Sequence, residues 1–171
     1  MAATPERLAE KGLTIGLASP AAVASLSGLE IVEAMGNGRL PMPPMAGVLP
    51  VVPHAWSEGE VEFRAWPETR FYNPMGTVHG GWAMTLLDTA TAIAALSTLK
   101  AGETYTSLDT AVRFVRPIFE ETGELRAFGS VVSRGRSMIS VVGRLEDSSG
   151  KLFAHGTSAC MVLTQRRSAA Q

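Results

Sequence analysis

Residues 81–99 read GWAMTLLDTATAIAALSTL. Small or apolar side chains occupy nearly all faces of the helix that this stretch would form, which is typical of a helix surrounded by protein. The helix would be about 28 Å long. Between Phe71 and Leu99, Asp88 is the only side chain that is charged by default. We therefore expect one long central helix that carries a single buried carboxylate.

Strand patterns lie on both sides of this helix. The expected strands span residues 46–56, 59–66, 105–117, 124–133, 137–147 and 151–164. Short turns join the four later strands, so these should pair antiparallel, because a parallel pair needs a long crossover. A strongly curved sheet can bury a helix by wrapping around it. The sequence therefore predicts the α+β class, with an antiparallel sheet around one helix.

The first part of the chain predicts two kinds of segment. Residues 1–20 show no sustained periodicity, and we expect a flexible N-terminal arm there. Apolar residues follow helical spacing from Ala21 to Met35, before the stop signal Gly36-Asn37-Gly38. We expect an extra N-terminal helix, one domain over residues 21–164 and a C-terminal tail over residues 165–171.

Composition excludes several classes of partner. A formal net charge of -1 offers no general attraction to nucleic acid or to an anionic membrane surface. The three histidines are scattered and lack metal-ligand spacing, so we expect neither a metal site nor a cofactor. The single cysteine, Cys160, and the charged start of the chain favour a cytoplasmic protein.

Asp88 is the first candidate for chemistry. Burying a carboxylate costs several kcal/mol unless partners offset the cost. One interpretation is a core aspartate bound to Thr85, Thr91 or another hydroxyl. The other is a general base, because removal from water makes a carboxylate a stronger base. We favour the second interpretation, since carboxylates in such environments cluster at functional sites.

The start of the helix is the second candidate. Gly80-Gly81 would let a ligand approach the unpaired first-turn N–H groups, which can stabilise negative charge on a carbonyl oxygen. Alternatively, the two glycines only cap the helix. Asn73 and His79 taken singly are a turn residue and a helix-entry residue. Together, the Asn73 amide could donate to a carbonyl, and His79 could orient the loop or that carbonyl.

Hydroxyl and guanidinium groups on the later strands are further candidates. Thr106 and Ser107 could hold an attacking water, although strand hydroxyls are ordinarily only a polar face. Guanidinium groups suit phosphate, and a turn with two arginines adds backbone N–H groups. They could equally be solvated edge charges that prevent aggregation. The arginine candidates are Arg113, Arg116 and the turn Arg134-Gly135-Arg136.

The spacing of these residues resembles that of a known family. Residues 73–81 read NPMGTVHGG and Asp88 follows after six residues, as in the PaaI-like hotdog thioesterases of the phenylacetate-pathway type. The resemblance covers about residues 27–164. It includes Ser107-Leu108-Asp109, Val115-Arg116-Pro117, Gly135-Arg136 and the hairpin Asp147 to Gly150, and Leu40 to Pro44 resembles a subset with an extra N-terminal helix.

The resemblance implies a hotdog fold and an acyl-CoA thioesterase. Asn73 and the Gly80 N–H would polarise the thioester carbonyl, and Asp88 would act as general base or nucleophile. Ser107 would place the water, because the residue one turn after Asp88 is Ala92, where some members carry a hydroxyl. Gly81, Thr106 and the arginines would bind substrate, including the nucleotide end of coenzyme A.

In this family the site lies between two subunits, so the resemblance also implies a homodimer or a dimer of dimers. The acyl group would be small, medium-chain or aromatic. Two alternatives stay open at this point. One is a hotdog hydratase or dehydratase acting on hydroxyacyl thioesters, and the other is a non-catalytic acyl-CoA-binding protein.

Overall fold

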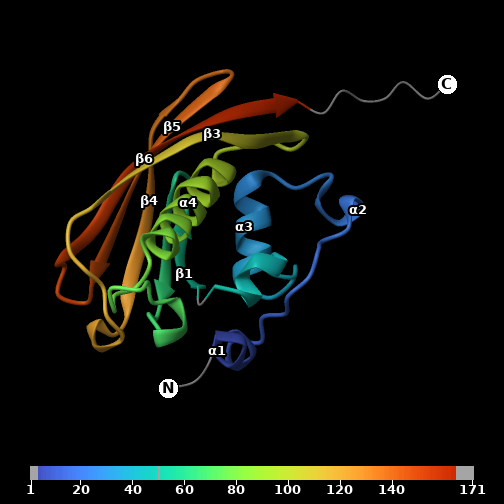
Figure 1. Ribbon diagram of the computed structural model, residues 1–171. Coiled ribbons are helices and arrows are strands. Elements are labelled where there is room, and N and C mark those ends of the chain that lie inside the picture. The colour runs from blue at the N-terminus through green and yellow to red at the C-terminus, as the bar shows by residue number, and fades with distance from the viewer. Residues whose placement is uncertain (1–3, 50, 165–171) are drawn as a thin grey trace.

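The computed structural model describes residues 4–49 and 51–164 and arranges them in three layers. A six-stranded antiparallel sheet curves around one side of helix α4 (Gly80–Ser97) (Figure 1). Helix α3 (Gly28–Gly36) lies on the opposite side of α4. This arrangement confirms the expected hotdog fold with an extra N-terminal helix.

The sheet has the strand order β1-β2-β4-β5-β6-β3. Its strands are β1 (Val51–Ser57), β2 (Glu60–Ala65), β3 (Glu103–Phe114), β4 (Leu125–Arg134), β5 (Met138–Asp147) and β6 (Leu152–Thr164). All neighbouring strands pair antiparallel, and β4–β5 and β5–β6 pair across short turns as expected. The expected pairing of β3 with β4 is wrong, because the chain after β3 leads to the middle of the sheet, where β4 pairs with β2 and β5, while β3 pairs with β6. β1 and β3 form the two edges, and β3 pairs along one side only, with β6.

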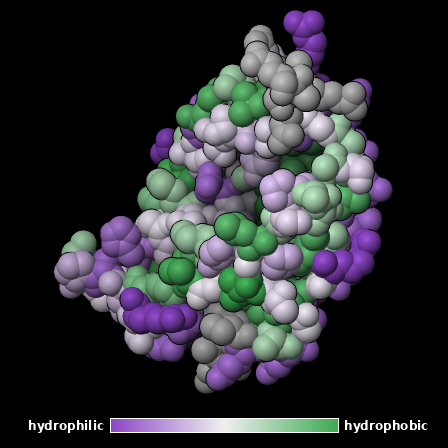
Figure 2. All heavy atoms as spheres, turned by 90° about the vertical axis from the view of Figure 1, so that its right-hand side faces the viewer, coloured by the Kyte–Doolittle hydropathy of each residue, from purple (hydrophilic) through white to green (hydrophobic). Residues whose placement is uncertain are grey.

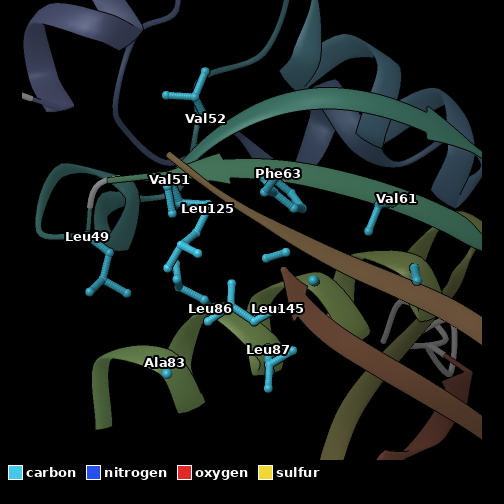
Figure 3. Close-up of a cluster of buried hydrophobic side chains, with 14 of the residues drawn as sticks. Leu49, Val51, Val52, Val61, Phe63, Ala83, Leu86, Leu87, Leu125 and Leu145 are labelled. Carbon is cyan, nitrogen blue, oxygen red and sulfur yellow. The ribbon is translucent and has the colours of Figure 1, made fainter. Parts of the chain in front are cut away.

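Glycines in the sheet let α4 approach it closely. A Cβ atom on Gly129 of β4 would lie 2.1 Å from the carbonyl oxygen of Ala90, and one on Gly143 of β5 would lie 3.0 Å from Thr91 Cγ2. Side chains from both layers fill the rest of the core. Figure 3 shows Leu86 and Leu87 of α4 among apolar side chains from the strands, including Phe63 of β2.

The N-terminal helix differs from the expectation of one helix over residues 21–35. It is divided into α2 (Pro20–Val23) and α3, because Ser27 caps the second helix. The Ser27 Oγ accepts from the Glu30 N–H, and the Ser27 N–H donates to the Glu30 carboxylate at 2.7 Å. Such a reciprocal cap stabilises a helix start at that residue.

Part of the segment expected to be a flexible arm is docked on the domain. Helix α1 (Thr4–Glu10) places Leu8 in the core with 1% exposure, and the Arg7 guanidinium lies 3.9 Å from the centre of the Trp66 ring. No periodic pattern indicated this docking, because only Leu8 in α1 and Leu13 just after it are buried apolar side chains in the described part of the segment. The domain boundaries stay a prediction, and residues 165–171 lie outside the described residues.

Candidate functional site

The loop before α4 is closed by Asn73. Its side-chain oxygen accepts from the N–H groups of Met75 at 2.9 Å and Thr77 at 3.3 Å, and its Nδ2 donates to Thr77 Oγ1 at 2.8 Å. This leaves one Nδ2 hydrogen without an acceptor among the described residues. The amide thus shapes the loop and keeps one donor for a ligand.

His79 forms the N-cap of α4. Its ring Nδ1 accepts from the Gly81 N–H at 2.9 Å, and the backbone N–H of His79 donates to the Phe71 carbonyl at 2.8 Å. An accepting Nδ1 requires the proton of the neutral ring to be on Nε2, and the exposed ring can present this donor to a ligand. Because the His79 ring accepts the Gly81 N–H, the Gly80 N–H is the donor at the helix start that has no acceptor among the described residues.

Gly80 lies in close contact with the exposed ring of Phe114 on β3. A Cβ atom there would lie 2.9 Å from Cζ of Phe114. A crevice of about 330 Å³ lies beside this contact, and its walls include Gly80, Phe114 and Arg116. The start of the long helix therefore combines a free backbone donor, the positive end of the helix dipole and space for a ligand.

Asp88 lies two turns further along α4 and is half-buried. Its Oδ1 accepts a hydrogen bond of 2.8 Å from the Thr110 hydroxyl of β3. Thr85 and Thr91 instead donate to backbone carbonyls of α4. The hydroxyl that binds Asp88 is therefore that of Thr110, a strand residue that the sequence did not indicate.

A β-bulge explains why Thr110, and not Ser107, reaches Asp88. The register of β3 against β6 shifts between Ser107 and Asp109, so that Ser107 faces Cys160 and Thr110 faces Ser158. Residues three apart would face opposite sides of a regular strand, and the bulge puts both on the same face. Nothing in the residue pattern indicates this bulge.

Ser107 belongs to a row of polar groups behind Asp88. Its Oγ lies 4.0 Å from Cys160 Sγ, while the Ser158 hydroxyl donates to the Asp109 carbonyl at 2.8 Å and lies 3.3 Å from Thr110 Oγ1. Burial raises the pKa of the nearby Tyr105 phenol above its ordinary value, and the charge of Asp88 acts in the same direction. Tyr105 is therefore neutral.

The face of α4 that carries Asp88 is open in the single chain. Gly81 and Met84 are exposed, and Thr85, Asp88 and Ala92 are half-buried. The expectation of a helix enclosed on all sides thus holds for its sheet side and its C-terminal half. The N-terminal half leaves a stripe on which a ligand or a second chain can lie.

The structure separates the arginine candidates into two groups. Arg113 and Arg116 are at the C-terminal end of β3, whereas the turn Arg134-Gly135-Arg136 lies near Glu103 at its other end. A strand of this length is roughly 36 Å long. The two groups of one chain are therefore too far apart to bind one phosphate cluster.

The arginine side chains also differ in their partners within the chain. Arg134 is half-buried and forms an ion pair of 2.8 Å with Glu103, whereas Arg136 is exposed. Arg116 donates to the Leu152 carbonyl and lines both the crevice at Gly80 and a wider groove of about 520 Å³ that also contains Lys151. Arg116 thus connects the helix start to a second cationic group. Thr106 is exposed and its Oγ1 lies 3.5 Å from the Ser107 carbonyl, away from Asp88.

Two further features concern metals and membranes. The described residues contain no group of three or more histidine, cysteine, aspartate or glutamate side chains placed to hold a metal ion. Within residues 4–49 and 51–164, no helix combines the length and hydropathy needed to cross a membrane.

Comparisons with known proteins agree with this fold. The sequence profile of the thioesterase superfamily matches residues 75–154. A phenylacetic acid degradation-related protein of Ralstonia eutropha, described as a candidate thioesterase, is 35% identical. Its structure has a TM-score of 0.69, and the match covers 75% of this chain and 97% of that one. No curated protein has a matching sequence.

Two more distant structures share the fold. The PaaI protein of the Escherichia coli phenylacetic acid degradation operon is 21% identical, with a TM-score of 0.69 and coverage of 82% of this chain and 96% of that one. A Streptococcus mutans protein crystallised with acetyl-CoA is also 21% identical, with a TM-score of 0.61 and coverage of 68% and 91%. The 35% identical relative and the matched profile together establish that this chain belongs to the thioesterase superfamily and has the hotdog fold of its PaaI-type members.

Proposed function

We propose that this protein hydrolyses an acyl-CoA thioester, with Asp88 as general base or nucleophile. The observation that carries the proposal is a carboxylate held by Thr110 on the open face of a helix whose first N–H group, that of Gly80, has no acceptor among the described residues. In one route Asp88 takes a proton from water as the water oxygen attacks the carbonyl carbon, and the coenzyme A thiolate leaves. In the other route Asp88 itself attacks, the thiolate leaves, and water then hydrolyses the resulting acyl-enzyme anhydride to the free acid and Asp88. The Gly80 N–H and the free Asn73 hydrogen would stabilise the charge on the carbonyl oxygen.

The base and the carbonyl donors of one site must come from different subunits. Asp88 follows Gly80 by eight residues, which is about 12 Å along a helix. Groups that act on one thioester must lie within hydrogen-bonding distance of its reacting atoms. Asp88 of one chain and Gly80 of the same chain therefore cannot act together, whereas a second copy brings its helix start to this Asp88.

The free edge of β3 offers the surface for such a second copy. This strand is long, its outer edge is unpaired in the single chain and Leu108 is 53% exposed. A long free edge tends to pair with another chain. Antiparallel pairing of β3 with its copy around a twofold axis would extend the sheet and cover the open stripe of α4.

The coenzyme A moiety of the bound substrate would extend from the site along Arg116. From the crevice at Gly80 this side chain leads to the groove with Lys151, whose rim also contains Phe119. Cations and an aromatic ring suit phosphates and a purine. The acetyl-CoA in the Streptococcus mutans structure is consistent with a coenzyme A ligand on this fold. In contrast, Arg134 is neutralised by Glu103 and is a weaker candidate.

A thiol-release assay over a panel of acyl-CoAs tests the reaction. Asp88→Asn should lower kcat by a factor of at least ~10² without changing the melting temperature, because the amide is not a base. Glu58→Gln is the control, since Glu58 is an exposed carboxylate in the turn between β1 and β2, away from the proposed site and from β3, and it should retain activity. Wild-type turnover by Asp88→Asn would refute the mechanism. Conversion of a hydroxyacyl-CoA without thiol release would instead indicate a hydratase or dehydratase.

Mixing two inactive variants tests the shared site. Asp88→Asn and Asn73→Ala affect different halves of each site, so a heterodimer contains one intact site and one doubly altered site. After subunit exchange, the mixture should recover about a quarter of the wild-type activity. No recovery in a mixture that mass spectrometry shows to contain heterodimers would contradict the shared site.

A further inference from the structure

We propose that the apolar cavity between α3, the 3-10 turn η1 (Pro44–Gly47) and α4 receives the far end of the acyl group. The site would thereby select an apolar acyl chain of medium length, straight or ending in an aromatic ring, over acetyl. This inference rests on the proposed thioesterase reaction and names its substrate class. The cavity volume is about 60 Å³, and residues of α3, η1, the first two strands and α4 line it.

The walls of this cavity suit a hydrocarbon. They include three methionines, Met35, Met42 and Met45, and the Phe63 ring of β2. No charged side chain lines it, and Thr89 supplies the one polar side chain, whose hydroxyl has no hydrogen-bond partner among the described residues. Leaving a charged or strongly polar acyl end in such surroundings would be costly, because few partners could replace its hydration.

The cavity also borders the helix that carries Asp88. Thr89 and Ile93 of α4 form one wall, and Thr89 directly follows Asp88. Successive helical residues are 100° apart, which corresponds to about 9 Å around the outside of a helix. The residues on the helical surface between these two directions are Thr85 and Ala92, which are small and half-buried. A chain can therefore cross α4 there without a bulky side chain in its path.

This distance determines which acyl groups benefit from the cavity. With its carbonyl carbon at Asp88, a chain must cross the Thr85 and Ala92 surface before its end enters the cavity. Acetyl is too short to reach it, whereas hexanoyl, octanoyl and phenylalkanoyl chains extend far enough. Each methylene group that is buried favours binding by a factor of about four.

The methionines can adjust the size of the cavity. Methionine side chains are unbranched and flexible, so they rearrange around ligands of different shape. Met45 is 51% exposed at the outer wall and lies where the N-terminal layer meets solvent. Figure 2 views the molecule from the side of this layer and shows that apolar residues reach the surface there. The N-terminal layer is thus expected to contribute to specificity as well as to stability.

Substitution of Ile93 changes the cavity and leaves the proposed catalytic groups in place. Ile93→Phe fills it and should lower the kcat/KM ratio of octanoyl-CoA to acetyl-CoA at least ~10-fold, because two or more methylene groups lose their site. Ile93→Ala enlarges it and should move the preferred chain length upward, toward decanoyl-CoA. Ile31 of α3 is half-buried but outside the lining, so Ile31→Phe and Ile31→Ala are matched controls that should leave the ratio unchanged.

A binding measurement keeps this inference separate from the proposed reaction. Octanoate should bind wild-type protein in calorimetry, acetate should not, and Ile93→Phe should abolish octanoate binding. If Ile93→Phe does not fold, Met45→Ala, at a partly exposed wall, should weaken octanoate binding and the preference for octanoyl-CoA. Turnover with an unchanged chain-length ratio in these variants would overturn the cavity assignment alone. Octanoate binding without thioester hydrolysis would overturn the proposed reaction alone.

Discussion

The two halves of α4 are built for different purposes. In the C-terminal half, Ala94, Ala95 and Ser97 are buried, and a Cβ atom on Gly28 of α3 would overlap the Leu96 carbonyl. Ser97 Oγ also accepts from the Gly59 N–H at 2.8 Å and ties the helix to the turn between β1 and β2. In the N-terminal half, Gly81 and Met84 are exposed.

This difference indicates how a single helix can hold the proposed catalytic carboxylate in place. The covered half fixes the position and direction of the helix through backbone contacts that tolerate no added atom. The N-terminal half carries Asp88 and the Gly80 N–H on its open face, while Trp82, Leu86 and Leu87 on its other face pack into the core. Substitutions on the covered surfaces should therefore mainly affect stability, and substitutions on the open face should mainly affect turnover.

The largest expected effect is on stability, where the sheet covers α4. Gly129→Ala places a Cβ atom 2.1 Å from the Ala90 carbonyl oxygen, so that helix and sheet must move apart. We expect the free energy of unfolding to fall by about 3 kcal/mol in urea denaturation. Gly16→Ala is the control, because its Cβ atom would meet only ordinary contacts at 3.5 Å, and it should change stability by less than about 0.5 kcal/mol. Equal effects of the two changes would contradict the close-contact explanation.

A smaller effect is expected at the carboxylate of the open half. Thr110→Val removes the hydroxyl that donates to Asp88 but keeps the shape of the side chain. A hydrogen bond to a charged group contributes about 1.5–3 kcal/mol, so kcat should fall about tenfold or more, with little change in KM. Thr110→Ser keeps the donor and should restore most of the turnover. A change in KM without a fall in kcat, or a Thr110→Ser variant with turnover as low as that of Thr110→Val, would show that Thr110 does not position the carboxylate.

The smallest expected effect is on stability, at Glu103, which lies after the C-terminal end of α4 at the start of β3. The Lys100 N–H and the Arg134 guanidinium hold the pKa of this carboxyl below its ordinary value, against partial burial. A lowered pKa in the folded state stabilises the protein above the ordinary value of 4.5, and this contribution is lost as the pH falls through the lowered value.

Glu103→Gln should therefore reduce stability near neutral pH and have no effect in strong acid. Because the pair is partly exposed to solvent, the difference should stay below about 1 kcal/mol. Thermal unfolding of both proteins across the acid range measures it. A constant difference at all pH values would show that the charge of Glu103 is not responsible.

Much of this fold follows from local patterns. The helix expected from about residue 81 to residue 99 is observed at Gly80–Ser97, and the expected later strands differ from the observed ones by a few residues at most. Periodicity and turn residues act over a few positions, so they can be read along the chain. The roles of the candidate residues are still predictions, and the variants above are their test.

The linear pattern was thus sufficient for the long helix, its lone carboxylate and the glycines at its start, because each of these depends on neighbours in sequence. Tertiary structure alone decided which hydroxyl meets Asp88, since a bulge near Leu108 changes the face on which every later β3 side chain lies. It also decided that Arg134 is paired with Glu103 and that residues 28–47 enclose a cavity against Thr89. Contacts between distant segments depend on strand register and on packing, and neither leaves a periodic signal in the sequence.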